Sequence, residues 1–316
     1  MRRPVTVLVL LVGLAYVPFL GNPLLWDDRE YMHLSPFTKS WENLPAAFTT
    51  ARQDRGWTEK PAYRPLATAT YFVDYALWKM WPVGRRLPNL LIHLATTVLL
   101  YRILARLLSQ TGPAFWGALL YGLHPSNSEV ILCVMFRHAA LSGLALAGIT
   151  WLHLKGHGRA AAPAALAAGL LAKETLIVTP ALIWLLERFA GPVRTAPGLK
   201  PGPHAALRAA APYAAVVCVY ALLRILLLPG PEFDIRPPGM TPARHVLSQG
   251  LTALAAIPAL VAQSVWPARL SVDYVIPRVQ GWQDPRLLLA AALAAALVAA
   301  ARRWARPVPV AALGLI

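Results

Sequence analysis

Long apolar stretches recur along this chain, and they restrict what it can fold into more than any other feature. A helix needs about 20 mostly apolar residues to cross a bilayer. Hydrocarbon offers no partner for an unpaired peptide group, so each such stretch must be helical. The sequence therefore predicts an all-α integral membrane protein with roughly 8–10 transmembrane or re-entrant helices. The stretches near this length are 5–20, 86–108, 138–154, 174–190, 206–228, 245–265 and 285–301, and shorter ones lie at 113–123 and 160–172.

The composition agrees with a membrane location. Hydrophobic residues make up 57% of the 316 residues and charged ones only 14%, which leaves too little polar surface for a water-soluble globule. The formal charge of +16 could point to nucleic acid, but the Lys and Arg residues are scattered singly at the ends of apolar stretches. We therefore expect no nucleic acid partner. Cys133 and Cys218 lie inside apolar stretches, which predicts packing rather than a disulfide or a metal site.

The distribution of positive charge predicts an orientation. Arg2 and Arg3 precede the first apolar stretch, and residues 16–22 lack the small-residue pattern of a signal-peptide cleavage site. We therefore expect a retained anchor and a cytoplasmic N-terminus. The polar segment 21–85 then forms a large first outer loop that carries short amphipathic helices.

A second outer region is predicted at 229–284. If 245–265 crossed the membrane completely, the arginines within 302–306 would lie outside, against the positive-inside rule. Because Pro258 interrupts this stretch, we expect a re-entrant or interfacial helix at 245–265.

Polar residues at the ends of the apolar stretches gather on the predicted outer side. Such residues are costly near a bilayer, so a shared location predicts a common site. Arg86, Asn89 and His93 are also spaced to share one helix face. The outer candidates are Asp27, Asp28, Tyr63, Arg64, His93, His124, Glu129, Arg137, Lys173 and Glu174.

The chemistry that these residues could support is displacement at the anomeric carbon of a sugar. Transfer to a hydroxyl needs a carboxylate that accepts the hydroxyl proton and cations that stabilise a departing lipid phosphate. Asp27 or Asp28 suits the first role. Arg64, Arg137 and Lys173 suit the second, since Arg can hold a phosphate through two parallel hydrogen bonds.

Each residue also has a purely structural interpretation. The aspartates could cap a loop, and Lys173 and Glu174 could form a local ion pair. His93 lies in an apolar run, where packing histidines outnumber ligands, and His124 precedes a proline and could simply end a helix. No spacing of ligand residues is typical of a metal site, so we expect no metal and no cofactor.

Several short motifs follow one another in a specific order along the chain. They are Trp26-Asp27-Asp28, Tyr63-Arg64-Pro65-Leu66, Asp74-Tyr75-Ala76-Leu77-Trp78, Asn89-Leu90-Leu91-Ile92-His93, Leu123-His124-Pro125, Glu129-Val130, Arg137, Ala172-Lys173-Glu174 and Leu270-Ser271-Val272-Asp273-Tyr274. Their order resembles the membrane portion of the transmembrane and tetratricopeptide-repeat O-mannosyltransferase family and its bacterial relatives, which are GT-C glycosyltransferases. The resemblance implies one GT-C-like membrane domain over residues 1–316, without the repeats and with a C-terminus truncated relative to the family.

The resemblance also implies an activity. Family members transfer a sugar, mannose or a similar one, from a polyprenyl-phosphate donor to an acceptor hydroxyl on the outer face, usually with inversion. The implied partners are membrane lipid, the lipid-linked donor, and an acceptor protein, lipid or glycan. A bacterial inner membrane, spanned several times, is the implied location.

The resemblance assigns roles to individual residues as well. Asp27 and Asp28 match the acidic pair expected to hold the base, and Lys173-Glu174 matches the family's Lys-Glu pair. Two departures occur, since Asn127 stands where the family often has a second His and Ala139 replaces an Asp. The remaining matches are His124 and Glu129 in an outer-loop motif, and Asp273 and Tyr274 near the end of the matched region.

Two other function classes fit parts of the sequence. A transporter or flippase of lipid-linked substrates would place ionisable groups near mid-membrane. The segment centres 94–100, 141–150 and 211–217 carry none. A noncatalytic membrane scaffold is the other alternative, and in it Asp27 and Asp28 would be dispensable.

Overall fold

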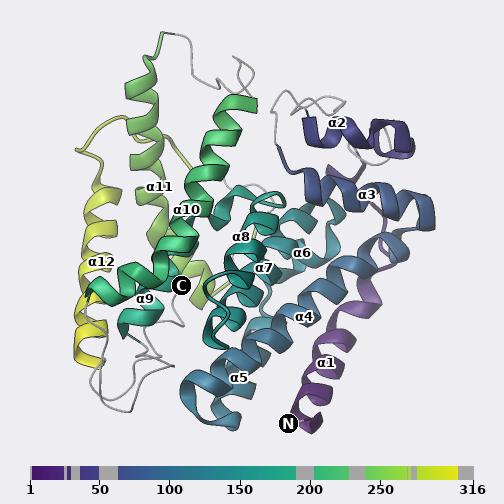
Figure 1. Ribbon diagram of the computed structural model, residues 1–316, viewed down its shortest axis with the longest axis horizontal. Coiled ribbons are helices and arrows are strands. Elements are labelled where there is room, and N and C mark those ends of the chain that lie inside the picture. Colours follow the sequence, from purple (N-terminus) through teal and green to yellow (C-terminus); the bar gives the residue numbers. More distant parts are fainter. Residues whose placement is uncertain are drawn as a thin grey trace. The chain divides into compact units, whose positions relative to one another are not determined.

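The protein is described by a computed structural model that covers residues 2–24, 27–29, 36–49, 63–189, 203–227, 239–268, 270–271 and 276–304. All regular secondary structure in these ranges is helical (Figure 1). The chain divides into two compact units, residues 1–231 and residues 232–316, and each is described by itself. The all-α prediction is therefore confirmed for the described ranges.

The helices of unit 1 coincide with the apolar stretches predicted there, and shorter helices lie in the polar segments. The α-helices are α1 (Arg2–Tyr16), α2 (Leu44–Thr49), α3 (Pro65–Trp78), α4 (Pro82–Leu108), α5 (Thr111–Leu123), α6 (Asn127–Leu132), α7 (Arg137–Leu154), α8 (Ala161–Leu170), α9 (Thr179–Phe189) and α10 (Pro203–Leu227). Short 3-10 helices are η1 (Val17–Phe19), η3 (Phe37–Lys39), η4 (Trp41–Asn43), η5 (Val134–Phe136) and η6 (Glu174–Val178).

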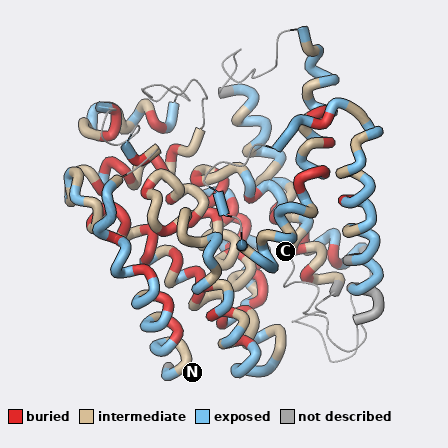
Figure 2. Tube along the Cα trace, turned by 180° about the vertical axis from the view of Figure 1, so that it is seen from behind, coloured by how far each residue is buried: buried red, intermediate tan, exposed pale blue. Residues whose placement is uncertain are grey.

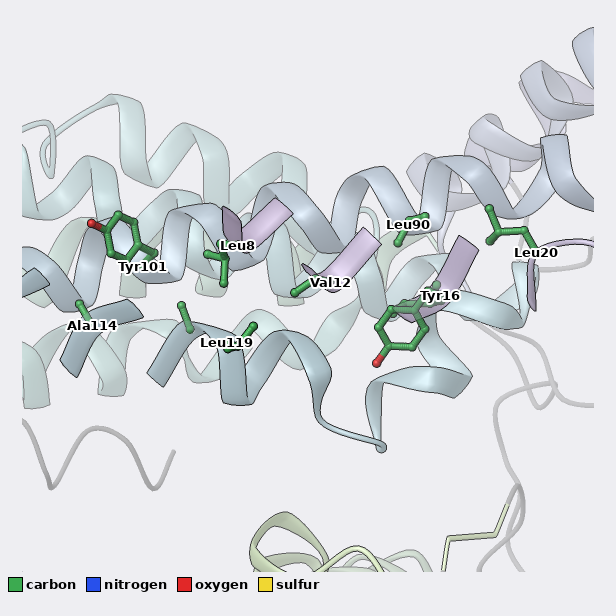
Figure 3. Close-up of a cluster of buried hydrophobic side chains, with 10 residues drawn as sticks. Leu8, Val12, Tyr16, Leu20, Leu90, Tyr101, Ala114 and Leu119 are labelled. Carbon is green, nitrogen blue, oxygen red and sulfur yellow. The ribbon is translucent and has the colours of Figure 1, made fainter. Parts of the chain in front are cut away.

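The best-packed part of unit 1 joins α1, α4 and α5. Leu8, Val12 and Tyr16 are four residues apart, so they share one face of α1, and all three are buried. Figure 3 shows these side chains beside residues of α4 and α5, and together they form one apolar cluster. The opposite face of α1 is apolar too, but Leu10 and Leu14 are exposed. Figure 2 shows buried and exposed positions alternating along this N-terminal helix. A helix that is apolar all round is typical of a lipid environment.

Three helices of the described chain are long and apolar enough to cross a membrane. They are Pro82–Leu108, His204–Leu226 and Pro242–Val265, and shorter apolar helices lie at Arg3–Phe19, Ala161–Leu170 and Pro285–Ala300. Candidate spans are thus present as expected for a membrane protein. The count of roughly 8–10 spans and the orientation stay predictions.

Unit 2 contains α11 (Pro242–Val265) and α12 (Pro285–Trp304), which pack against each other. The Ser248 hydroxyl donates a hydrogen bond of 2.5 Å to the Val279 carbonyl, which ties the intervening segment to α11. Helix α11 continues through Pro258, so the expected interruption does not break it. Whether α11 re-enters or crosses the membrane stays a prediction.

A sharp change of direction after α5 creates the polar end of unit 1. His124 precedes Pro125, and a residue before proline is driven out of the helical region. The backbone of His124 is accordingly extended, with φ −62° and ψ 127°, and α5 ends there. The short helices α6 and η5 then pack along α4 before α7 begins at Arg137. The polar sequence 124–138 therefore lies beside the first turns of α4.

Candidate active site

Five half-buried charged residues from distant parts of the sequence meet at the polar end of unit 1. We call them the charged cluster: Asp27, Arg64, Glu129, Lys173 and Glu174. Short helices and helix ends carry all of them, as expected for functional groups held by a scaffold.

Arg64 and Glu174 form the best-defined contact of the charged cluster. Arg64 lies just before α3, and Glu174 begins η6. The Leu66 amide donates a hydrogen bond of 3.0 Å to the Leu171 carbonyl, which brings these two segments together. The Arg64 guanidinium then donates twice to the Glu174 carboxylate, from Nη2 at 3.0 Å and from Nε at 3.4 Å. This fork fixes Arg64 while its side chain stays 26% exposed.

The other three members influence one another through their charges. Burial and the neighbouring Asp27 charge raise the pKa of Glu129, and the Lys173 ammonium opposes this. Burial and the Arg64 charge lower the pKa of Lys173, against the pull of Glu174 and Glu129. Two carboxylates and two cations therefore lie close enough for their charges to act on Glu129 and Lys173. Such mutual perturbation is typical of functional sites.

Glu174 responds in the opposite sense from Glu129. Burial opposes its ionisation, but the hydrogen bonds and charge of Arg64 outweigh burial and lower the pKa of Glu174 to about 2. Glu174 is thus a permanent anion at neutral pH, whose role is to hold Arg64. Glu129 has a pKa raised towards the working range of an acid or base.

Residues not predicted from the sequence also adjoin the charged cluster. His138, in the first turn of α7, lies close enough to Arg64 and Lys173 for their charges to act on it. Its Nδ1 lies 2.7 Å from the Met135 carbonyl oxygen. The charge of Arg224 in α10 helps to lower the pKa of Glu174, and Arg224 donates a 2.9 Å hydrogen bond to the Tyr220 hydroxyl. His138 directly follows Arg137, which could have drawn attention to it, whereas nothing in the sequence ties Arg224 to this place.

Asp28 belongs to a different group from its neighbour Asp27. Its side chain is 1% exposed, and both carboxylate oxygens accept hydrogen bonds. The amides of Val134 and Met135 donate to it at 3.0 and 2.9 Å, and the Cys133 thiol donates at 3.2 Å. Asp28 therefore holds the start of η5.

Arg137 is fully engaged inside the protein. Its guanidinium forms an ion pair of 2.5 Å with Asp74 and donates to the Asn89 side chain at 2.7 Å. It also donates to the Thr70 hydroxyl at 3.2 Å and to the Arg85 carbonyl at 2.7 Å. Only 1% of its surface is exposed. These contacts give Arg137 a structural role inside the protein. Its contact with a donor phosphate stays a prediction.

Arg86 and the Asn89 side-chain NH2 group donate to backbone carbonyls, while the Asn89 side-chain oxygen accepts from Arg137. Arg86 donates to the carbonyls of Leu20 and Leu132. Asn89 donates to those of Val130 and Cys133 at 3.0 and 2.9 Å. We call the second group the buried polar cluster: Asp28, Asp74, Arg86, Asn89 and Arg137. All five are buried, so this cluster is part of the core.

The remaining predicted residues are placed as follows. His93 is buried in α4 with its Nε2 3.0 Å from the Gly122 carbonyl, and its ring stacks on Tyr121. His124 ends α5, and its Nδ1 accepts a 3.3 Å hydrogen bond from the Ser126 amide. The Tyr63 hydroxyl donates to the Phe48 carbonyl at 2.9 Å. Their predicted roles in a site stay predictions.

Two predicted site residues, Asp273 and Tyr274, lie outside the described residues. Among the described residues, no group of three or more His, Cys, Asp or Glu side chains could hold a metal ion.

The chain is similar in sequence to two known proteins. The chain is 24% identical over 157 residues to "Protein O-mannosyl-transferase F38B6.6" of Caenorhabditis elegans, in a match that covers 47% of the chain and 23% of that protein. It is 28% identical over 122 residues to "Protein O-mannosyl-transferase Tmtc3" of Drosophila melanogaster, covering 32% of the chain and 13% of that protein. The matches thus span less than a quarter of either relative. No family model and no solved structure matches the chain. The resemblance read from the motifs is confirmed as a distant and partial one.

Proposed function

We propose, from this distant relationship to protein O-mannosyltransferases, that the chain is a membrane glycosyltransferase that uses a polyprenyl-phosphate sugar. The sugar is mannose or a similar hexose, and the acceptor is a hydroxyl on the outer side of the membrane. The observation that carries the proposal is the charged cluster, in which Asp27 and Glu129 lie beside Lys173 and Arg64. Carboxylates next to cations are what transfer from a phosphate leaving group requires.

Asp27 is the proposed catalytic base. Its neighbour Asp28 is buried with both oxygens engaged, so an acceptor hydroxyl has little access to it. Asp27 is half-buried and lies by Glu129, at the charged cluster. As the acceptor oxygen attacks the anomeric carbon, its proton passes to the Asp27 carboxylate, and the bond from that carbon to the phosphate oxygen breaks. One displacement of this kind inverts the anomeric centre.

Lys173 and Arg64 are the proposed ligands of the leaving phosphate. Both are half-buried, so their charges are strengthened by partial desolvation yet remain within reach of a ligand. Arg64 is already oriented by Glu174, which lowers the cost of fixing it when a donor binds. Arg137 is left out of this role because its guanidinium is committed to Asp74, Asn89 and backbone. No metal or cofactor takes part in the proposed step.

Transfer by the purified protein in proteoliposomes tests the proposal. The donor is radiolabelled polyprenyl-phosphate mannose, and the acceptors are serine- and threonine-containing peptides, short glycans and water. Asp27→Asn should lower the transfer rate by about 10²–10⁴-fold, because the positioned base is lost. Glu42→Gln removes an exposed carboxylate from η4 and serves as the matched control with an unchanged rate. Unchanged transfer by Asp27→Asn would rule out this base. Donor movement across the bilayer without transfer would favour the flippase alternative.

A further inference from the structure

Two chain segments that carry two acids of the charged cluster, Asp27 and Glu129, are bound to one arginine. Arg86 projects from the second turn of α4 and is 3% exposed. On one side it donates to the carbonyls of Leu20 at 2.9 Å, Pro23 at 2.8 Å and Asn22, all in the segment that follows α1. On the other side its Nε donates to the Leu132 carbonyl at 2.5 Å, at the end of α6.

Asp28 joins the same two segments from the opposite direction. It belongs to the segment after α1, and it accepts hydrogen bonds from the Cys133 thiol and the amides of Val134 and Met135. Arg86 therefore binds carbonyl groups at residues 20–23 and 132, while Asp28 binds donor groups at residues 133–135. We call Arg86 and Asp28 the clamp.

The clamp lies next to Asp27 and Glu129 in the sequence. Asp27 directly precedes Asp28, and Glu129 lies one turn before Leu132 in α6. We infer that Arg86 and Asp28 are positioning residues, which set the separation of Asp27 and Glu129 without touching the substrate. This inference rests on the proposed function, because it presumes that Asp27 acts as the base and that its separation from Glu129 matters for transfer to the acceptor.

The chemistry of the guanidinium explains why this position needs Arg. Its planar fork carries five N–H donors, so one side chain can bind four carbonyls that point in different directions. A lysine ammonium has three donors on one atom and cannot reach both segments at once. Asn89 adds hydrogen bonds to the carbonyls of Val130 and Cys133, which holds α6 against α4 even when the clamp is loosened. A clamp variant should therefore fold while its two acids lose their fixed separation.

A rescue experiment separates positioning from direct catalysis. Arg86→Lys should lower kcat by about 10²-fold through misplacement alone, with an unchanged KM for the donor, because Lys173 and Arg64 lie outside the clamp. A Cβ added at Gly21 would lie 3.9 Å from Val83 Cγ2, so Gly21→Cys with Val83→Cys places two thiols within reach of a disulfide between the loop and α4. In the Arg86→Lys background this disulfide should restore kcat at least tenfold, and reduction should abolish the gain. The two cysteines alone should leave the activity unchanged.

Two results would overturn the inference. One is an Arg86→Lys variant with wild-type kcat, and the other is a deficit that the disulfide leaves untouched, which would make Arg86 a direct participant. If Arg86→Lys fails to fold, Asp28→Asn takes its place, since one amide N–H then faces a backbone donor and the same disulfide should rescue it.

A distance measurement tests the clamp without relying on the proposed function. Spin labels at the exposed positions Asn22 and Ser126 should give a narrow distance distribution in the otherwise wild-type protein. Arg86→Lys should broaden this distribution, whether or not the sugar donor has been identified correctly. An unchanged distribution in Arg86→Lys would refute the clamp. Absence of transfer by the wild-type protein would refute only the proposed function.

Discussion

Two groups of polar residues at one end of unit 1 contain the same kinds of side chain and differ in what those side chains contact. In the buried polar cluster, Asp28 binds backbone amides, and Arg137 binds the Asp74 carboxylate, the Asn89 side chain and a backbone carbonyl; each is 1% exposed. In the charged cluster, Arg64 binds one carboxylate and keeps 26% of its side chain accessible. Residue type alone therefore does not separate scaffold from site, whereas the number of partners and the exposure do.

The two groups should also differ in how much they contribute to stability. Removing one partner of a buried ion pair leaves an uncompensated charge in a region of low dielectric, whereas an exposed pair is screened by water. Mutation of Arg137 or Asp74, the ion pair of the buried polar cluster, should thus unfold the protein before it changes the chemistry. Mutation of the charged cluster should do the reverse.

The largest expected effect is the loss of stability in Arg137→Ala. The substitution strips Asp74 of its 2.5 Å partner and leaves the Asn89 oxygen without its donor. We expect the free energy of unfolding to fall by about 3–5 kcal/mol. Thermal unfolding of the protein in detergent measures the loss.

Arg64→Ala is the matched control for that experiment. Because Arg64 and Glu174 are partly exposed, we expect a loss of stability below about 1 kcal/mol. Equal losses in Arg64→Ala and Arg137→Ala would abolish the distinction between the two clusters.

The next effect concerns the affinity for the donor. If Arg64 binds the leaving phosphate, Arg64→Ala removes charge-assisted hydrogen bonds and should weaken donor binding about 10–100-fold. Titration of the purified protein with polyprenyl-phosphate mannose gives the affinity. Arg102→Ala, at an exposed position of α4, should leave it unchanged. Wild-type affinity in Arg64→Ala would remove Arg64 from the proposed site.

The sequence predicted the elements of this fold better than the placement of its polar side chains. Each apolar stretch forms a helix, because a long apolar segment in lipid must pair its own backbone N–H and C=O groups. Pro258 was expected to interrupt α11, but the helix continues through it. A proline within a helix removes one hydrogen bond, and in a membrane helix neighbouring groups or a local adjustment of the backbone can satisfy the freed carbonyl.

The division between Asp27 and Asp28 could not be predicted from the sequence. Both follow the same helix and have the same chemistry, and only the position of η5 decides which carboxylate is buried. Arg137 was predicted to bind phosphate because an arginine at a helix end has that capacity. Its partners Asp74 and Asn89 come from α3 and α4, so their convergence depends on tertiary packing.

A smaller effect should appear in the pH dependence of donor binding. If Lys173 holds the leaving phosphate as proposed, binding requires its ammonium form, so affinity should fall as the pH rises through the pKa of Lys173. Burial and Arg64 already lower that pKa, and Glu174 opposes them. Glu174→Gln removes the opposing charge, so it should lower the pKa of Lys173 further and move the alkaline limb to lower pH.

Glu174→Asp retains the charge and is the control for this titration, since its alkaline limb should stay near that of the wild-type protein. A limb that moves to higher pH in Glu174→Gln would contradict the electrostatic coupling between Glu174 and Lys173.

The smallest effect is expected at His93, which the sequence placed among the site residues. Its ring stacks on Tyr121 and lies edge-on to Tyr16, and one ring nitrogen lies 3.0 Å from the Gly122 carbonyl. His93→Phe keeps the ring contacts and loses only the hydrogen bond, so the free energy of unfolding should fall by about 1 kcal/mol with no change in transfer rate. His93→Ala also opens a cavity between α1, α4 and α5 and should cost more stability. A folded His93→Phe variant that no longer transfers sugar would show that the site extends into the core of unit 1, and the contrast between the two clusters would then have to include a third group.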